Sequence, residues 1–446
     1  MSRWPIVLLA AAIAFTPPAT VGAQQRDSNP NPMDSIARLP GYRPAHDTLP
    51  LLTDRRLALL PRNERAAWRA YLKRSREAYT RDSAAMQSEL RSAGVTAMIR
   101  GPYTHEFSVK PYMTPVWFAA DTARRMAEMM LTFQAPNGGW SKHVDFTRHP
   151  RAPGESYFTE SNRWEWISTI DNDATTSEMR FLAGVDAARR DVRYEQAFLL
   201  GLDYLLAAQY PNGCWPQVYP LEGSYHDAAT FNDDAIINVA ELLGAVERGE
   251  YAFVPAAQRR RAGAAVDRAL DCVLASQVVV HGTPTVWGQQ HDPLTLAPTS
   301  ARSYELTSLT AQESARIAHW LMTLPAPSAR VVAAVHAAAE WFRESEIHGY
   351  RYDFVSGRHD APGAGPLWAR MYEIGTNRPI FSNRDGVKLY DWNLLTDRRH
   401  GYGWYTEAPA AVLREYAQWA RRHPRGAVPH AAGATTTSSA STSHRP

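Results

Sequence analysis

Apolar and polar residues alternate at helical spacing in one long early segment. Between Pro61 and Gly94 the apolar residues recur at intervals of four and seven, and many of the positions between them are Arg or Glu. The apolar members are Trp68, Leu72, Tyr79, Met86 and Leu90. Because such spacing places these residues on one face of a helix, it predicts a long amphipathic helix. We expect it to pack on the outside of the main domain, with a separate interaction helix as the alternative.

A repeat gives the main domain its architecture. The pattern Gln134, Asn137, Gly138, Trp140 recurs as Gln209, Asn212, Gly213, Trp215, and each copy follows a helical run. Asn and Gly tolerate left-handed backbone, so each Pro-Asn-Gly turn ends its helix. A third helix, from Ala262 to Gln277, also ends in Gln, with Gly282 and Trp287 beyond it.

A period of about 70 residues holds two helices and their loops. The repeat therefore predicts successive helical hairpins that close into an α/α toroid, with long loops and only weak, scattered strand signals. Trp140 and Trp215 are expected to pack within the hairpins rather than to stack on a ligand.

The two ends of the chain predict export and a tail. Arg3, the apolar run from Ile6 to Phe15 and the small residues up to Ala23 are typical of a secretory signal peptide, residues 1–23. The run is shorter than the roughly 20 residues of a membrane span. We therefore expect a periplasmic or secreted protein, with a retained N-terminal anchor as the alternative. The Thr- and Ser-rich end, 425–446, predicts a disordered tail.

Composition narrows the function. Hydrophobic residues make up 45% of the chain, enough for a sizeable core. The net charge of +3 is too balanced for a general nucleic-acid-binding surface, so an anionic ligand must be met locally. Cys214 and Cys272, the only cysteines, fit no metal-site spacing. They can form one disulfide in an oxidising compartment, and their pairing is left open.

Short segments in a fixed order, between Pro111 and Trp419, carry a resemblance to a known family. They are Gln134–Trp140, Thr169–Asn172, Gly201–Gln209, Thr230–Ala235, Trp287–Pro293, Ala301–Glu305, Leu367–Arg370 and Glu373–Gly386. Together they resemble the pectate lyases of polysaccharide lyase family 10. The resemblance implies an (α/α)3 toroid, residues 106–424, that cleaves polygalacturonate by calcium-assisted β-elimination. It does not cover the N-terminal helical extension, residues 24–105, or the tail.

Triterpene cyclases share the Gln-x-x-x-Gly-x-Trp pattern and are an alternative family. They need an acidic motif with three aspartates, whereas this chain has only Asp233 and Asp234 beside Asn232. That reading is therefore disfavoured.

Elimination from a uronate removes a carbon-bound proton next to a carboxylate, so the site must neutralise charge and supply a base. Calcium suits the first task, because it binds flexible sets of oxygen ligands and acts as a Lewis acid. The resemblance implies Asp171 and Asp233, with Asn172, as calcium ligands. Helix capping is the alternative for these residues. Asp173 departs from the small residue that we expect at its position.

The resemblance also implies Arg302 as the base. An arginine has an unperturbed pKa of roughly 12.5 to 13.8, so it is ordinarily charged. Calcium and neighbouring arginines would favour its neutral form, and we expect a rate that rises well above pH 7, toward about 9 or 10. The alternative is a surface salt bridge from Arg302 to Glu305 or Asp292.

Three arginines in a loop-rich segment are candidate contacts for substrate carboxylates, which a planar guanidinium binds through two hydrogen bonds. The resemblance implies substrate binding by Arg370 and Arg384. For Arg378 an ion pair with Glu373 is the alternative. Lys142 is a further candidate, and Tyr304 is the aromatic residue expected in the cleft.

Other chemistries lack their central motifs, because no nucleophile elbow, phosphate-binding loop, dinucleotide-binding turn or zinc-protease helix is present. An inverting glycoside hydrolase remains the enzymatic alternative, with Asp171 and Asp233 as its acid and base. A non-catalytic uronate-binding protein is the third possibility. We expect an acidic polysaccharide as the partner, no nucleic acid, no membrane contact after signal removal, and a monomer.

Overall fold

The computed structural model describes residues 52–105, 107–157 and 167–425. The predicted signal peptide and all but the first residue of the predicted tail lie outside these ranges. No helix within them is long and apolar enough to cross a membrane.

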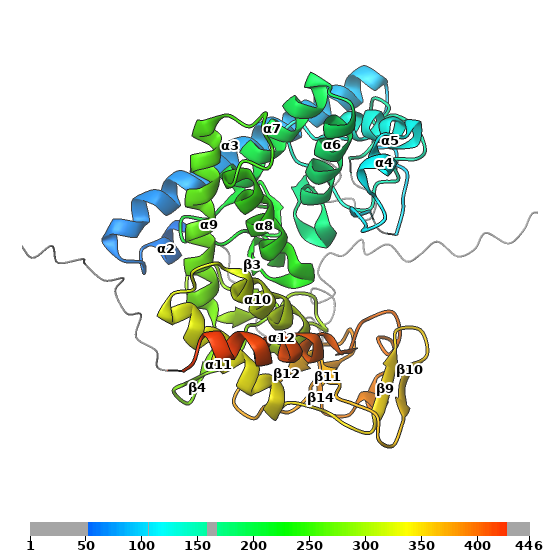
Figure 1. Ribbon diagram of the computed structural model, residues 1–446. Coiled ribbons are helices and arrows are strands. Elements are labelled where there is room, and N and C mark those ends of the chain that lie inside the picture. Colours follow the sequence, from blue (N-terminus) through cyan, green and yellow to red (C-terminus); the bar gives the residue numbers. More distant parts are fainter. Residues whose placement is uncertain (1–51, 106, 158–166, 426–446) are drawn as a thin grey trace, which may run out of the picture.

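Helical hairpins follow one another along the chain, as the repeat predicted (Figure 1). The helices are α2 (Asp54–Leu57), α3 (Arg62–Ala93), α4 (Pro115–Phe118), α5 (Asp121–Thr132), α6 (Thr176–Ala188), α7 (Val192–Ala208), α8 (Ala235–Glu247), α9 (Ala256–Ser276), α10 (Ala311–Thr323), α11 (Ala329–Glu344) and α12 (Ala408–Arg422). In the hairpins, α6 packs on α7, α8 on α9 and α10 on α11. Helix α8 also contacts both α6 and α10, while α9 contacts both α7 and α11. The hairpins thus form two layers.

Short antiparallel strands connect the hairpins. The pairs are β1 (Ser168–Thr169) with β2 (Val218–Tyr219), β4 (Val279–Val280) with β5 (Thr283–Pro284), β8 (Leu309–Thr310) with β12 (Met371–Tyr372), β9 (Tyr350–Asp353) with β10 (Gly357–Asp360), β11 (Trp368–Ala369) with β15 (Tyr405–Thr406), and β13 (Phe381–Ser382) with β14 (Lys388–Leu389). A three-stranded sheet has the order β3 (Ala229–Thr230), β6 (Gln290–His291), β7 (Pro298–Thr299). Strand β1 leads toward the start of α6, β3 toward the start of α8, and β8 toward the start of α10. The polar residues between each strand and its helix therefore lie at one end of the layer formed by α6, α8 and α10.

The long N-terminal helix is present as predicted. Helix α3 ends at Gly94, whose φ of 69° closes the helix in left-handed backbone. The predicted apolar face is buried except for Tyr79, which is 40% exposed. Trp68 stacks 5.1 Å from Tyr210, and the Tyr71 hydroxyl donates to the carbonyl of Ala208. The helix therefore packs on the main domain and shares its core.

The glutamine of each repeat joins the turn in which it lies to the second helix of the following hairpin, which is α7, α9 or α11. Nε2 of Gln134 donates to the carbonyls of Gly138 and Ala197, at 2.7 and 2.8 Å. Gln209 and Gln277 make the equivalent pairs with Gly213 and Ala265, and with Thr285 and Ala334. Because one amide group satisfies both carbonyls, the repeat fixes the spacing between consecutive hairpins.

The tryptophans of the repeat are hairpin packing residues, as predicted. Trp140, Trp215 and Trp287 are fully buried. Each indole N–H donates to a carbonyl of the helix that comes before it, at Met130, Leu205 and Val273 respectively. They are therefore unavailable for stacking on a sugar.

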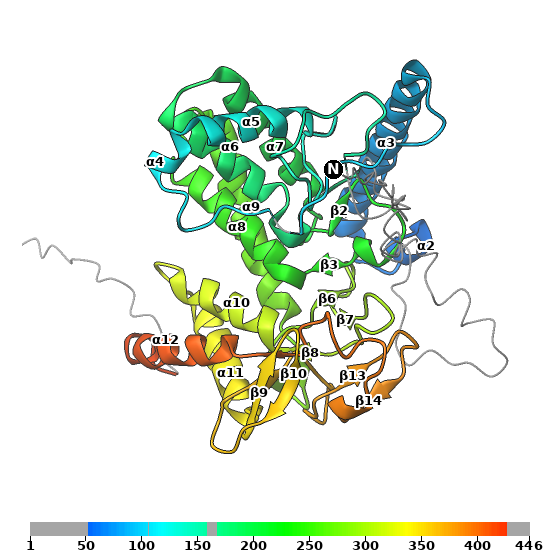
Figure 2. The same ribbon diagram turned by 90° about the vertical axis from the view of Figure 1, so that its right-hand side faces the viewer.

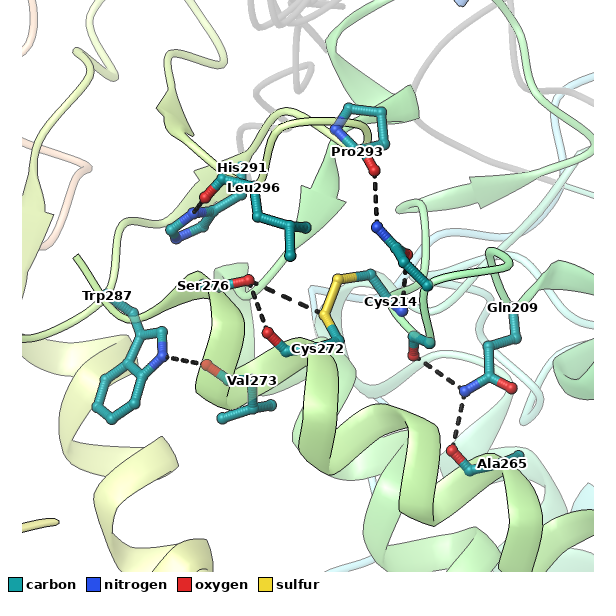
Figure 3. The surroundings of a disulfide bond; sticks show 12 residues. Gln209, Cys214, Ala265, Cys272, Val273, Ser276, Trp287, His291, Pro293 and Leu296 are labelled. Carbon is teal, nitrogen blue, oxygen red and sulfur yellow. Dashed lines mark hydrogen bonds between the residues drawn. A yellow bond between two sulfur atoms is a disulfide. The ribbon is translucent and has the colours of Figure 1, made fainter. Parts of the chain in front are cut away.

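The two cysteines are joined. Cys214, in the second turn, bonds to Cys272 of α9, and their Cα atoms are 5.5 Å apart (Figure 3). Both residues are buried, and Gln209 holds the same turn to α9 through Ala265. The sequence left this pairing open, and the structure shows the disulfide. The second turn is therefore attached to α9 twice, by the disulfide and by the hydrogen bond from Gln209 to Ala265.

Gly213 is the glycine at which substitution is expected to be most costly for this turn. Its φ is +93°, and a Cβ atom would lie 2.0 Å from the carbonyl oxygen of Arg268. Gly375 has the same φ but open space around it, so a substitution there measures the cost of the left-handed backbone without a steric clash. We expect Gly375→Ala to lower the free energy of unfolding by about 1 kcal/mol. Gly213→Ala should lower it by about 3 kcal/mol or more, because overpacking adds to the strain. Equal losses in denaturant unfolding would contradict the close approach.

Candidate active site

Two short turns of similar backbone bring the predicted calcium ligands together. The turns η1 (Asp171–Asp173) and η3 (Asn232–Asp234) precede α6 and α8 and contact each other. Asn172 and Asp233 have φ values of 49° and 47°, in the left-handed region that Asn and Asp tolerate best among residues other than glycine. Neither turn makes a side-chain cap for its helix. The capping alternative is therefore not realised.

Hydrogen bonds join the two turns into one polar cluster. Nδ2 of Asn232 donates to Asp171 and Asp233, at 3.2 and 2.9 Å. Nδ2 of Asn172 donates to Asp233 at 3.2 Å. The Lys142 ammonium lies 2.6 Å from Oδ2 of Asp171 and 3.1 Å from Oδ1 of Asn172. Lys142 thus contacts the predicted ligands directly.

The two aspartates of this cluster differ in how well nearby positive charge stabilises their ionised forms. Burial alone would raise the pKa of Asp171, but Lys142, with smaller effects from Arg302 and Gln217, lowers that pKa below its usual value. Burial, and then the negative charge of Asp171, raise the pKa of Asp233 to about 6. The buried carboxylate of Asp171 therefore disfavours ionisation of the half-buried Asp233, an effect that a bound cation would relieve.

The donor set fits calcium. Asp171 and Asp233 offer carboxylate oxygens and Asn172 an amide oxygen, all of them hard ligands that calcium prefers. Among the described residues, no three His, Cys, Asp or Glu side chains form a metal-binding group by themselves. The amide of Asn172 and further oxygens would therefore have to complete the coordination. Asp173 accepts a hydrogen bond from Asn238 of α8.

Arg302 lies between a buried carboxylate and two aromatic rings. Its Nε and Nη2 donate to the two carboxylate oxygens of Glu305, at 2.8 and 2.6 Å. Its guanidinium carbon is 5.0 Å from the ring centroid of Tyr304 and 6.0 Å from that of Tyr402. The side chain of Arg302 is 39% exposed, while that of Glu305 is buried.

The expectation of a depressed pKa at Arg302 is not met by the residues of the chain. Burial disfavours the charged guanidinium, but the charge and hydrogen bonds of Glu305, together with the neighbouring Tyr304 and Tyr225, raise the pKa of Arg302 well above its ordinary value. In return, Arg302 helps to lower the pKa of Glu305 to about 2, against the effect of burial. The ion pair with Glu305, one of the alternatives for Arg302, is therefore present. The alternative with Asp292 is not, because Asp292 pairs with Arg56.

Further guanidinium groups surround the same two rings. Around Tyr304 lie Arg384 and Arg398, at 5.9 and 4.2 Å, in addition to Arg302. Around Tyr402 lie Arg370 and Arg398, at 4.9 and 5.5 Å. Tyr304 is buried, so it supports the arginines more than it lines an open surface. We call Arg302, Arg370, Arg384 and Arg398 the arginine cluster.

Arg370 links the arginine cluster to the predicted calcium ligands. Its Nη2 lies 2.6 Å from the buried carboxylate of Glu313, in α10, and 3.1 Å from Oδ1 of Asn232. The same atom is 3.5 Å from Asp233. The positive cluster and the predicted metal ligands are therefore adjacent parts of one site.

The remaining predicted substrate contacts differ in position. Arg384 belongs to the arginine cluster and also lies 3.8 Å from Asp397. Arg378 instead stacks on Tyr390, 3.7 Å from its centroid, and no contact between Arg378 and the arginine cluster is found in the described residues. Its alternative partner, Glu373, pairs with Lys388 at 2.7 Å. The structure therefore brings Arg384 into the site but shows no such contact for Arg378.

The sequence interpretation did not name three residues of the site: Glu313, which pairs with Arg370, and Tyr402 and Arg398. It named Glu305 only as an ion-pair alternative for Arg302, within a segment that carried the family resemblance. Tyr402 and Arg398 lie in a loop without a motif. Their roles depend on contacts with residues far away in the sequence.

Comparisons with known proteins agree with this geometry. A family model described as pectic acid lyase matches residues 134–413. A family 10 polysaccharide lyase from Cellvibrio cellulosa is similar in structure, with 32% identity, a TM-score of 0.60, and coverage of 70% of this chain and 98% of its own. The chain belongs to polysaccharide lyase family 10.

A mutant of the Cellvibrio cellulosa lyase in complex with trigalacturonic acid is equally similar, with 32% identity and a TM-score of 0.60 over 68% of this chain and 96% of its own. No curated protein sequence matches. The predicted helical toroid is confirmed by these polysaccharide lyases. The chain is a polysaccharide lyase, so the glycoside hydrolase alternative is wrong.

Proposed function

We propose that this polysaccharide lyase is an exported pectate lyase that cleaves polygalacturonate by calcium-assisted β-elimination, with Arg302 as the base. The observation that carries the proposal is the position of the arginine cluster beside Asp171 and Asp233. A polyuronate presents one carboxylate per sugar, and this site offers guanidinium groups and a cation-binding set side by side. The similar lyase in complex with trigalacturonic acid supports this substrate class.

Each part of the site has a chemical task. Arg370 and Arg384 orient the substrate through its carboxylates, and Lys142 adds a further positive charge. Asp171, Asp233 and Asn172 would hold calcium, which neutralises the negative charge that develops on the substrate carboxylate. Arg302 takes the C5 proton, the C5–H electrons form the C4–C5 double bond, and the leaving oxygen departs with the electrons of its bond to C4 and takes a proton from water. Arg302 must be neutral to accept the proton, so the rate is expected to rise with pH.

The test is the formation of a 4,5-unsaturated product, followed by its ultraviolet absorbance during incubation with polygalacturonate at alkaline pH. Growth of the absorbance with calcium, and its loss with a chelator, supports the proposal. New reducing ends without the absorbance would overturn elimination. Binding without either product would mean a non-catalytic uronate-binding protein.

Export rests on the sequence of residues 1–23 and is supported by the buried disulfide, because such bonds persist in oxidising compartments. The mass of the mature N-terminus in the native host tests it. A monomeric state stays a prediction, checked by light scattering.

Arg398 is proposed as a further carboxylate-binding residue. Arg302, Arg370 and Arg384 each lie near a carboxylate of the chain, whereas no described carboxylate pairs with Arg398, whose Nε is buried without a partner. We expect Arg398→Gln to raise KM for polygalacturonate about tenfold or more while kcat changes less, because a charged hydrogen bond is lost. A purely structural residue would instead lower the melting temperature and reduce kcat and affinity together.

A further inference from the structure

A row of basic side chains follows one side of α3, outside the matched family region. Its members are Arg62, Arg65, Arg69, Lys73 and Arg76, separated by three, four, four and three residues. At about 100° per residue they fall within an arc of about 80°, and they span about 21 Å of helix. All are exposed except Arg65, which is half-buried. We call these five residues the basic stripe.

Little negative charge compensates the basic stripe. In the part of the chain that the structure describes, its one ion pair joins Lys73 to Glu77 at 3.8 Å, between side chains that are 72% and 62% exposed. Arg65 donates to a backbone carbonyl, at Leu60. Such an exposed pair is weak, so it leaves the stripe strongly positive. The whole chain carries only +3, so the stripe is a local concentration of positive charge.

The helix that carries the basic stripe is anchored in the core and bonded to the segment that follows β2. Trp68 and Tyr71, on the other side of the helix, are anchored in the core. Ser75 accepts a hydrogen bond at 2.9 Å from the backbone N–H of Leu221, which follows β2 closely. Strand β2 pairs with β1, and β1 leads directly into the turn that carries Asp171. Figure 2 shows α3 beside β2. The paired strands β1 and β2 therefore link α3 to the turn that carries the predicted calcium ligand Asp171.

We propose that the basic stripe is a second binding surface for polygalacturonate, outside the catalytic site. The inference rests on the proposed function, because it takes its ligand from it. Fixed cations along about four helical turns suit a linear polymer with a carboxylate on every sugar. A trimer held in the site would gain nothing from the stripe. A long chain can occupy the site and the stripe together, which raises its apparent affinity by multivalency.

The test compares a stripe variant with a matched control variant. The stripe variant is Arg62→Gln, Arg69→Gln and Arg76→Gln, and Gln maintains helix propensity. The control variant is Arg260→Gln, Arg414→Gln and Arg422→Gln, which removes the same charge from exposed helical positions elsewhere. KM and kcat are measured on long polygalacturonate and on trigalacturonate. Retention on an immobilised polygalacturonate gel is measured with Arg302→Ala added to each protein, so that the gel is not digested.

The stripe variant is expected to raise KM for the polymer about tenfold, from the loss of three exposed charge contacts, and to leave kcat/KM for the trimer unchanged. Gel retention should fall and depend less on salt. An unchanged KM for the polymer, or an equal rise in the control variant, would overturn the proposal. If the wild type cleaves neither substrate, the proposed function fails, and gel retention still decides whether the stripe binds polygalacturonate.

Discussion

Replacing Arg302 by Ala is expected to lower kcat on polygalacturonate by about 10²- to 10⁴-fold, the range of a lost general base. The structure supports this because Arg302 belongs to the arginine cluster and its side chain is partly exposed, so a substrate can reach it. Ultraviolet absorbance of the unsaturated product measures the loss. KM should change far less than kcat, because Arg370, Arg384 and Arg398 remain.

Arg302→Lys separates a base from a simple cation. A lysine retains the positive charge but cannot reproduce the paired hydrogen bonds to Glu305. If Arg302 only binds a substrate carboxylate, the lysine variant should retain most of kcat and change KM. Such a result, with a pH profile unchanged from that of the wild type, would remove Arg302 from the proton transfer, because a lysine base has a lower pKa and would move the rising limb to lower pH.

The pH profile carries the same information. Glu305 raises the pKa of Arg302, so at any pH below that pKa only a small neutral fraction is available to take a proton. The rate should therefore rise about tenfold per pH unit on the alkaline side of neutrality. Glu305→Gln removes the stabilising charge and lowers the pKa of Arg302, so the rising limb should move to lower pH. A falling rate above pH 7 in the wild type would contradict the assignment.

The second large effect is expected at Asp171. Asp171→Asn should weaken calcium binding by at least about 10- to 100-fold, because it removes one of the two carboxylates of the proposed calcium ligands. Calorimetric titration with calcium measures the affinity without relying on turnover. Activity should recover partly at high calcium concentration.

Asp173→Asn is the matched control for this change. It removes the same charge two residues away, from a carboxylate that accepts a hydrogen bond from Asn238 of α8. Its calcium affinity should stay within a few-fold of the wild type. Equal weakening in both variants would mean that general charge, and not coordination, attracts the ion.

Much of the fold was predictable because it depends on local patterns. Apolar spacing located the helix from Arg62 to Ala93 almost to the residue, since one helical face must be buried wherever it packs. The spacing of Gln134, Gln209 and Gln277 gave the succession of hairpins, because each glutamine closes its own turn. The prediction was wrong for Tyr79, which is 40% exposed although its neighbours Ala78 and Asp82 are buried.

The site was only partly predictable. The ordered segments named Asp171, Asp233, Arg302 and Arg370, and the tertiary structure brings these residues into one site. The sequence did not find Arg398, because its position beside Tyr304 depends on two loops meeting. It also did not predict the sign of the pKa shift at Arg302, which is set by the competition between burial and Glu305.

By itself, the sequence determined the helical hairpins, the family resemblance and the residue types available for chemistry, because these follow from periodicity and from short motifs. Only the tertiary structure decided which charges compensate one another: Arg370 reaches Glu313 and Asp233, Cys214 bonds to Cys272, and Arg398 has no described carboxylate partner. The physical reason is that electrostatic and covalent pairing depends on distances of a few ångströms between segments that are far apart in the chain, and local periodicity does not encode those distances.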